Sequence, residues 1–253
     1  MHISVQFPPD KLPEDGAVQL ELTVEDRPVL SGTWSVRIWR GHKTLRPVGE
    51  WTETCTYREN GCEYREIDLP LSGDYRLQRF FLLSEDDRLL LIGDTILWDG
   101  DSPRKRRSGN DLWYESLLPY SPRFLPQEQF YMEDHLTFHR GKSPALRVMP
   151  LTLEPELEPD LGSFCAIESK PPYIRFRQSD EGQSMFVAML FDLDRKRLKK
   201  PFSWQQLTVG EDLRSVPTDR AVGYRIQLGK ANSIHGQSAR KQAAVFNKAR
   251  FAH

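Results

Sequence analysis

The sequence predicts an all-β protein, built as a large two-sheet antiparallel β-sandwich with few short helices. Apolar and polar residues alternate along many stretches, most regularly at residues 18–24, where every second residue is apolar. This alternation is typical of a strand with one buried face. The 18 prolines are spread over expected turns and strand ends, which argues against a helical bundle.

The same alternation predicts the individual strands in chain order. Two long apolar runs flank the short acidic turn at residues 84–87 and indicate a hairpin. Trp39 lies out of phase with the apolar residues before it, so we expect its side chain to face away from that core. The expected strands are residues 18–24, 34–38, 67–71, 75–83, 89–98, 145–153, 174–177, 184–193 and 224–228.

Helical signals are few. Residues 111–118 are expected to form two helical turns that end at Pro119, because proline stops a helix. Residues 239–249 contain good helix formers but are equally compatible with a final strand, and both alternatives stay open.

The chain length of 253 residues is compatible with one β-sandwich domain over residues 1–253. Residues 99–110 contain no apolar side chain and include four consecutive basic residues, which indicates a long loop or linker. A subdivision into 1–98 and 111–253 therefore stays open. The acidic, proline-interrupted stretch 154–160 is a second long connection.

The charge balance argues against partners that are recognised by net charge. The chain has 35 basic and 36 acidic side chains. A nucleic-acid-binding domain is expected to carry a strongly basic surface, and anionic membranes attract basic segments. We therefore expect no nucleic-acid partner and no membrane association.

The three cysteines, Cys55, Cys62 and Cys165, are expected to be reduced. A type I′ turn at residues 60–61 places Cys55 opposite Glu66 rather than opposite Cys62, so the two sulfurs are too far apart for a bridge. Free thiols and the lack of a recognisable signal sequence favour a cytoplasmic protein, although a signal peptide that had been removed would leave the same sequence.

Motifs that carry chemistry are absent from the sequence. His135 and His139 have the spacing of a zinc site on a helix but lack the glutamate of HExxH, and on a strand they lie about 13 Å apart. There is no GxSxG nucleophile elbow and no glycine-rich phosphate loop. We therefore assign no catalytic residue, no metal and no cofactor, and an enzyme is the less favoured class.

Aromatic residues give the one surface hypothesis. Trp39, Trp51, Trp113 and Tyr114 fall at positions where exposed rings would stack on sugar rings, whose C–H groups pack against aromatic faces. The alternative is that these rings cover a second packed layer, which burial of aromatic surface is sufficient to explain.

Residues 73–83 and 86–96 resemble hairpins in the β-sandwich domain of heparinase II/III-like polysaccharide lyases. In those hairpins an arginine-bearing strand precedes a strand that ends in a D-x-[IV] element, here Asp94-Thr95-Ile96. Residues 51–53 and 64–66 fit the same sheet, and the resemblance covers about a fifth of the chain.

This resemblance implies a large two-sheet sandwich of the supersandwich kind. It does not imply catalysis, because in those lyases most of the catalytic machinery lies in a helical toroid, and nothing in this sequence indicates such a toroid. Fold likeness alone does not give function. A relative without the toroid would bind, scaffold or assemble.

We therefore expect a non-catalytic β-sandwich protein that acts as a carbohydrate-binding or interaction module, with a carbohydrate or a protein as partner. One alternative is an enzyme fragment related to polysaccharide lyases or hydrolases, and another is a structural homo-oligomer. Arginines and aromatics cluster around the hairpin and the loop that follows it. The predicted binding residues are Arg76, Arg79, Trp113, Tyr114 and Tyr120.

Overall fold

The structure, a computed structural model, is almost entirely β. It describes residues 1–6, 14–100, 111–126, 135–153, 163–207, 210–211, 214–215, 221–228 and 242–247. Within these residues the one helical element is the 3-10 turn η1 (Glu14–Gly16). The chain forms two compact units, Met1–Asp194 and Arg195–His253. The predicted loop residues 101–110 and the stretch 154–160 lie outside the described residues.

One of the two large sheets of the first unit has seven strands and is antiparallel throughout. Strands β1, β2, β3, β9, β14 and β13 follow one another across it, and β4 pairs with β3. Their bounds are β1 (His2–Gln6), β2 (Val18–Val24), β3 (Arg27–Arg40), β4 (Lys43–Thr44), β9 (Leu112–Pro119), β13 (Phe164–Ser169) and β14 (Pro172–Asp180).

The other large sheet has eight antiparallel strands, in the order β10-β11-β12-β15-β8-β7-β6-β5. Their bounds are β5 (Thr52–Glu59), β6 (Cys62–Leu71), β7 (Tyr75–Ser84), β8 (Leu89–Trp98), β10 (Leu125–Pro126), β11 (Leu136–Arg140), β12 (Ser143–Pro150) and β15 (Met185–Asp192). The predicted hairpin is confirmed as β7 and β8.

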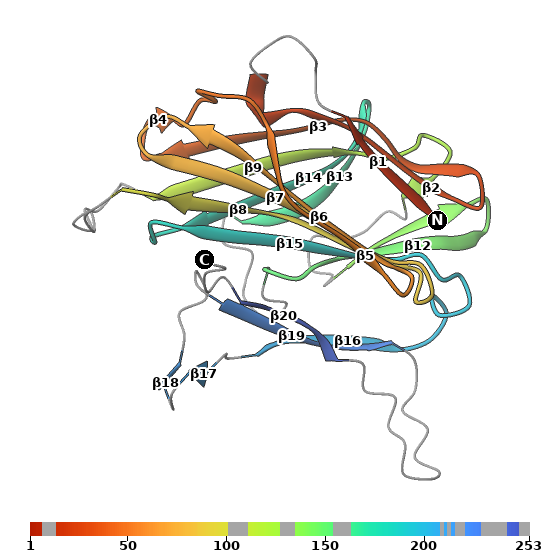
Figure 1. Cartoon of the computed structure of the whole chain (residues 1–253). Helices are drawn as coiled ribbons and strands as arrows, with labels where there is room; N and C mark the ends of the chain where they lie inside the picture. The colour runs from red at the N-terminus through yellow and green to blue at the C-terminus, as the bar shows by residue number, and fades with distance from the viewer. Residues whose placement is uncertain are drawn as a thin grey trace. The chain divides into compact units, whose positions relative to one another are not determined.

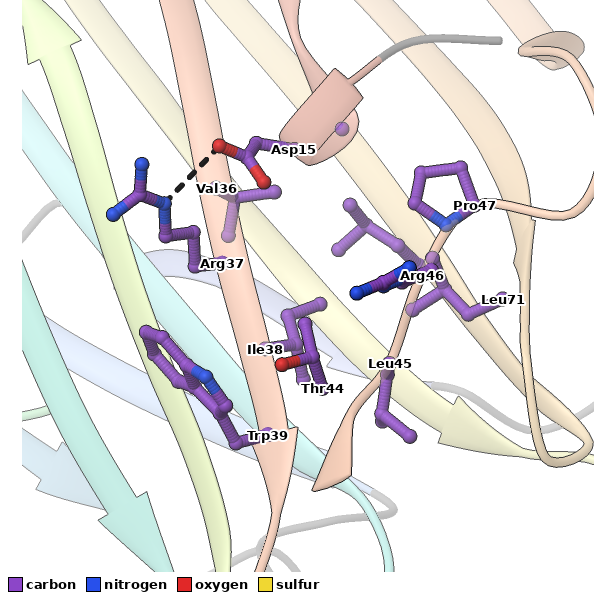
Figure 2. Close-up of a pocket in the computed structure, with 12 residues that line it drawn as sticks. Asp15, Val36, Arg37, Ile38, Trp39, Thr44, Leu45, Arg46, Pro47 and Leu71 are labelled. Atoms are coloured by element: carbon purple, nitrogen blue, oxygen red, sulfur yellow. Dashed lines mark hydrogen bonds and ion pairs between the residues drawn. The ribbon is translucent and has the colours of Figure 1, made fainter. Parts of the chain in front are cut away.

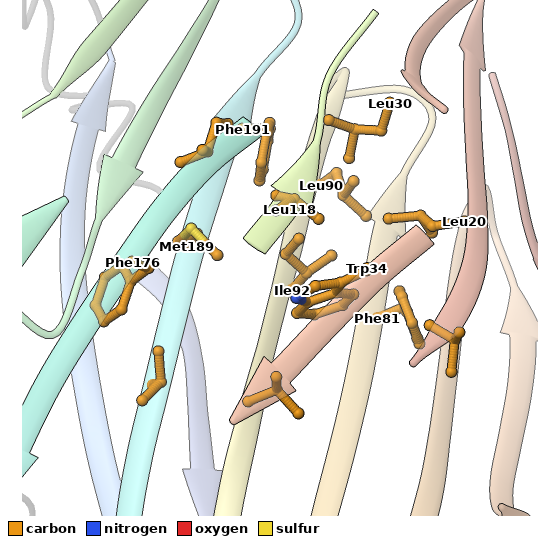
Figure 3. Packing of buried hydrophobic residues seen from close by; sticks show 14 of the residues in the cluster. Leu20, Leu30, Trp34, Phe81, Leu90, Ile92, Leu118, Phe176, Met189 and Phe191 are labelled. Atoms are coloured by element: carbon orange, nitrogen blue, oxygen red, sulfur yellow. The ribbon is translucent and has the colours of Figure 1, made fainter. Parts of the chain in front are cut away.

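The two sheets pack face to face as a sandwich (Figure 1). Side chains of both layers interdigitate in the core: the Trp34 ring of one sheet meets the Phe81 ring of the other edge-to-face, with centroids 5.8 Å apart (Figure 3). Along each strand the inward residues alternate with outward ones, as the sequence pattern predicts. The predicted all-β, two-sheet sandwich is confirmed.

The predicted helix at residues 111–118 is wrong, because this segment is strand β9. Its burial alternates: Leu112, Tyr114, Ser116 and Leu118 are buried, whereas the residues between them are partly exposed. Strand pairing on both sides, with β3 and β14, satisfies its backbone and overrides the local helical tendency. Pro119 is the last residue of the strand rather than a helix stop.

The second unit contains a three-stranded antiparallel sheet in the order β16-β19-β20, made of β16 (Phe202–Leu207), β19 (Ala221–Leu228) and β20 (Gln242–Asn247), and a short pair, β17 (Gly210–Glu211) with β18 (Arg214–Ser215). Strand β20 decides between the alternatives for residues 239–249: the described part of that stretch is a strand.

The β5–β6 hairpin confirms the predicted turn and register. Asn60 and Gly61 have φ angles of 48° and 72°, as a type I′ turn requires, and Cys55 lies opposite Glu66. All three cysteines are free: Cys55 is exposed, whereas Cys62 and Cys165 are partly buried.

These environments predict different thiol reactivities. Burial raises the pKa of the Cys165 thiol to about 12. Near pH 8 we expect iodoacetamide to modify Cys165 on the order of 1000-fold more slowly than an ordinary exposed thiol, because the thiolate is the nucleophile. Exposed Cys55 should account for the fast phase. Time-resolved mass spectrometry of labelled peptides measures both rates, and Cys55→Ser is the control. Equal rates at the two sites would contradict this assignment.

Candidate functional site

The outer face of the seven-stranded sheet carries two neighbouring tryptophans. Trp34, Val36 and Ile38 of β3 are buried, so Trp39 points to the opposite face, as predicted, and is partly exposed. On the adjacent strand β9, Trp113 lies directly opposite Trp39. Directly opposite residues share one face of a sheet, with Cβ atoms about 5 Å apart. We call Trp39 and Trp113 the tryptophan pair.

Charged side chains border the tryptophan pair on the same face. Arg177 of β14 lies with its guanidinium carbon 5.0 Å from the centre of the Trp113 ring, in the range of a cation–π contact. Glu115 lies opposite both Arg37 and Arg177 in the strand register. Flat apolar rings, guanidinium donors and a carboxylate acceptor therefore occur together on one partly exposed surface.

A groove adjoins this face at the edge of β3 (Figure 2). It has a volume of about 580 Å³, which is in the usual range for small-molecule sites. Figure 2 shows Arg37 and Trp39 on one side of β3, and Val36 and Ile38 on the other, toward residues 45–47.

Not all predicted binding residues are available to a ligand. Arg79 and Tyr114 are completely buried and Tyr120 is 3% exposed, so these side chains belong to the interior in this structure. The Tyr120 hydroxyl donates to the backbone oxygen of Glu168, 2.9 Å away. Trp51, which the sequence left open as an exposed ring, belongs to the core.

Arg79 pairs with Asp94 in the interior of the sandwich. The Arg79 Nε lies 2.7 Å from Asp94 Oδ1, and Nη2 lies 2.9 Å from Oδ2. The Tyr114 hydroxyl of the other sheet donates to Asp94 Oδ2 at 2.7 Å. Burial, together with the charge of Asp94, raises the pKa of the Tyr114 hydroxyl, which therefore stays protonated and keeps its role as donor.

The Trp34 side chain also contacts the buried Arg79–Asp94 pair, through the Arg79 guanidinium. The Arg79 guanidinium carbon lies 3.6 Å from the centre of the Trp34 ring, and the Trp34 indole N–H donates to Ser116 Oγ at 2.7 Å. We call Arg79, Asp94, Tyr114, Trp34 and Ser116 the buried network. It joins β7 and β8 of one sheet to β3 and β9 of the other, and β3 and β9 carry the tryptophan pair on their outer sides.

Arg76 and Trp113 are partly exposed but lie on different sheets. Arg76 points outward from β7 in the eight-stranded sheet, and Trp113 points outward from β9 in the seven-stranded sheet. The Arg76 guanidinium binds Asp68 and, at 3.1 Å, Asp99. On the outer face of the seven-stranded sheet, none of the other predicted binding residues therefore lies next to the Trp113 side chain.

Sequence reasoning missed Arg177 and the groove. Arg177 lies far from Trp113 along the chain, and only the pairing of β14 with β9 brings them together. The phase of Trp39 against Trp34, Val36 and Ile38 was the signal that identified one half of the tryptophan pair.

The comparisons with known proteins support the fold. No protein-family model and no curated protein matches the chain. Among solved structures, heparan sulfate lyase HepC from Pedobacter heparinus aligns with a TM-score of 0.53 at 12% identity over 93% of this chain and 37% of its own. A heparinase III aligns with a TM-score of 0.47 at 8% identity over 76% of this chain and 28% of its own.

The chain thus shares the β-sandwich fold found in HepC and spans less than two thirds of the length of either lyase. The likeness predicted from residues 73–96 is confirmed as a partial structural resemblance.

In the part of the chain that the structure describes, no helix has the length and apolarity needed to cross a membrane. Among the same residues, no group of His, Cys, Asp or Glu side chains has the arrangement of a metal site.

Proposed function

We propose that this chain is a non-catalytic β-sandwich module that binds carbohydrate through the tryptophan pair. The observation that carries the proposal is the pairing of Trp39 with Trp113 on the outer face of the seven-stranded sheet. Two adjacent indole rings offer a flat apolar surface to the C–H groups of a sugar ring. The Glu115 carboxylate and the guanidinium groups of Arg37 and Arg177 supply the acceptors and donors that hydroxyl groups need.

A glycan array tests this proposal. We expect selective binding by the purified chain and a loss of about 10-fold or more in affinity for Trp113→Ala, which corresponds to about 1.4 kcal/mol. Buried aromatic anchors commonly dominate binding energy. The matched control is Tyr57→Ala: Tyr57 is an exposed aromatic, 52% accessible, on β5 of the other sheet, and its loss should leave binding unchanged.

Two outcomes would contradict the proposal. One is a folded protein that binds no glycan on the array, in which case measurement of its size in solution tests the homo-oligomer hypothesis. The other is binding that survives both Trp39→Ala and Trp113→Ala.

The fold shared with HepC supports a second candidate, a fragment related to polysaccharide lyases. Incubation of the chain with each glycan that it binds, followed by sizing of the glycan, separates the two candidates. Shortened products would contradict a non-catalytic module, whereas unchanged glycan would support it.

A further inference from the structure

The groove at the edge of β3 differs chemically from the tryptophan pair. Strand β3 pairs with β2 as far as Trp34 and with β4 from Trp39, so none of the described strands pairs with residues 35–38 on that side. The groove occupies this gap, between η1 and residues 44–47.

The floor of the groove is aliphatic and buried. It is made by Val36 and Ile38 of β3, Leu45, and Leu71 and Leu77 of the other sheet, and all of these side chains are at most 8% exposed. Gly16 lets η1 approach this floor: a Cβ atom there would lie 2.8 Å from Val36 Cγ1, and its φ of +55° favours glycine.

The segment that bears Arg46 is fixed in place by backbone contacts. Leu45 N–H donates to the Ile38 carbonyl at 2.9 Å, and Arg46 N–H donates to Ser72 Oγ at 3.0 Å. The Ser72 N–H donates back to the Arg46 carbonyl at 2.8 Å. The backbone of this segment is therefore held at both ends of Arg46, while the side chain is exposed and extends over the groove (Figure 2).

Among the described residues, the rim of the groove carries two arginines, of which one has an ion-pair partner. Arg37 is neutralised by Asp15, whose carboxylate lies 3.1 Å from its Nε. Arg46 has no ion pair with any residue that the structure describes, although its planar guanidinium is suited to binding a carboxylate through two parallel hydrogen bonds.

We propose that this groove binds a small amphipathic carboxylate, with its aliphatic body on the leucine, isoleucine and valine floor and its carboxylate on Arg46. The volume suits a ligand of this size. A sugar fits this floor poorly, because aliphatic side chains leave buried hydroxyl groups without hydrogen-bond partners. The groove is thus a second site, chemically distinct from the proposed carbohydrate face that it adjoins at Arg37 and Trp39.

Titration of the full chain with octanoate, followed by calorimetry and by NMR shifts, tests this site. We expect saturable binding of octanoate, and a loss of 10-fold or more in its affinity for Arg46→Gln. Binding of uncharged 1-octanol should be weaker in the parent chain and unchanged by the substitution. The control is Arg88→Gln, which removes an exposed arginine that pairs with Glu25 at 2.9 Å away from the groove.

Each other result would overturn the proposal: no saturable binding of octanoate, equal binding of octanoate and 1-octanol, or unchanged octanoate affinity in Arg46→Gln. The tests of the two proposed sites are independent of each other. Trp113→Ala should leave octanoate binding intact, and Arg46→Gln should leave the glycan-array profile intact, so loss of one activity does not decide the other.

Discussion

We expect replacement of Arg79 by methionine to lower the free energy of unfolding by about 3–5 kcal/mol, the usual cost of removing one partner of a buried ion pair. Arg79 and Asp94 both have fully buried side chains, and their contact is bidentate at 2.7 and 2.9 Å. In the variant, the Asp94 carboxylate keeps only the Tyr114 hydroxyl among the side-chain donors of the buried network. Its lost hydrogen bonds cannot be replaced by bulk water.

The loss should extend beyond the ion pair itself. The Arg79 guanidinium also packs on the Trp34 ring at 3.6 Å and lies 3.4 Å from the backbone oxygens of Gly16 and Trp34. The contacts with Trp34 cross from one sheet to the other, so the substitution weakens the attachment between the two layers. Chemical denaturation followed by intrinsic tryptophan fluorescence measures the effect.

A double-mutant cycle separates the ion pair from packing. Asp94→Leu alone should cost as much as Arg79→Met, whereas the chain that carries both substitutions should be more stable than either single variant, because no uncompensated charge remains buried. Arg88→Met, in the exposed pair with Glu25, should cost at most about 1 kcal/mol. Additive losses in the double variant would contradict this account of the network.

The alternation of apolar residues was sufficient to predict the sandwich and the β7–β8 hairpin. The same alternation indicates that the Arg79 side chain faces the core, because Arg79 follows Leu77 and precedes Phe81 and Leu83 at the inward positions of β7. Asp94 has the same relation to Ile92 and Ile96 on β8. Two opposite charges in phase with a core on paired strands indicate a buried ion pair, whereas the clustering of arginines and aromatics around the hairpin suggested that Arg79 is a binding residue.

The candidate sites were harder to predict because they depend on which strands become neighbours. Arg76 and Trp113 belong to the arginines and aromatics that cluster in sequence around the hairpin and the loop after it, yet they project from the outer faces of two different sheets. Trp39, Trp113 and Arg177 come from three strands that are adjacent only in the folded sheet. The helix expected at residues 111–118 failed for the same reason, since pairing with β3 and β14 determines its conformation.

The second large effect is expected at Gly93, in the middle of β8. Strand β8 is paired on both sides, and Gly93 lies opposite Phe80 on β7 and Ala188 on β15. A Cβ atom at this position would lie 2.1 Å from the Val187 carbonyl oxygen and 2.7 Å from Cζ of the Phe80 ring. The Phe80 ring is itself stacked on Phe186, with centroids 5.6 Å apart, so it has little room to move aside.

We therefore expect Gly93→Ala to lower the free energy of unfolding by about 3 kcal/mol, the upper end of the cost of overpacking a core. This net loss already includes the gain of about 0.4–1 kcal/mol that alanine brings by restricting the unfolded chain, so the steric cost is larger still. Denaturation in urea measures the difference between the parent chain and the variant.

Gly141→Ala is the control, because no atom lies within 4 Å of a Cβ there and its φ of +61° gives only a backbone penalty, about 1–2 kcal/mol. The φ of Gly93 is not in the positive region, so its cost is purely steric. A loss at Gly93 smaller than that at Gly141 would show that β8 can shift between its neighbours. That result would contradict the explanation that close packing of Phe80 on the β8 backbone requires glycine at position 93.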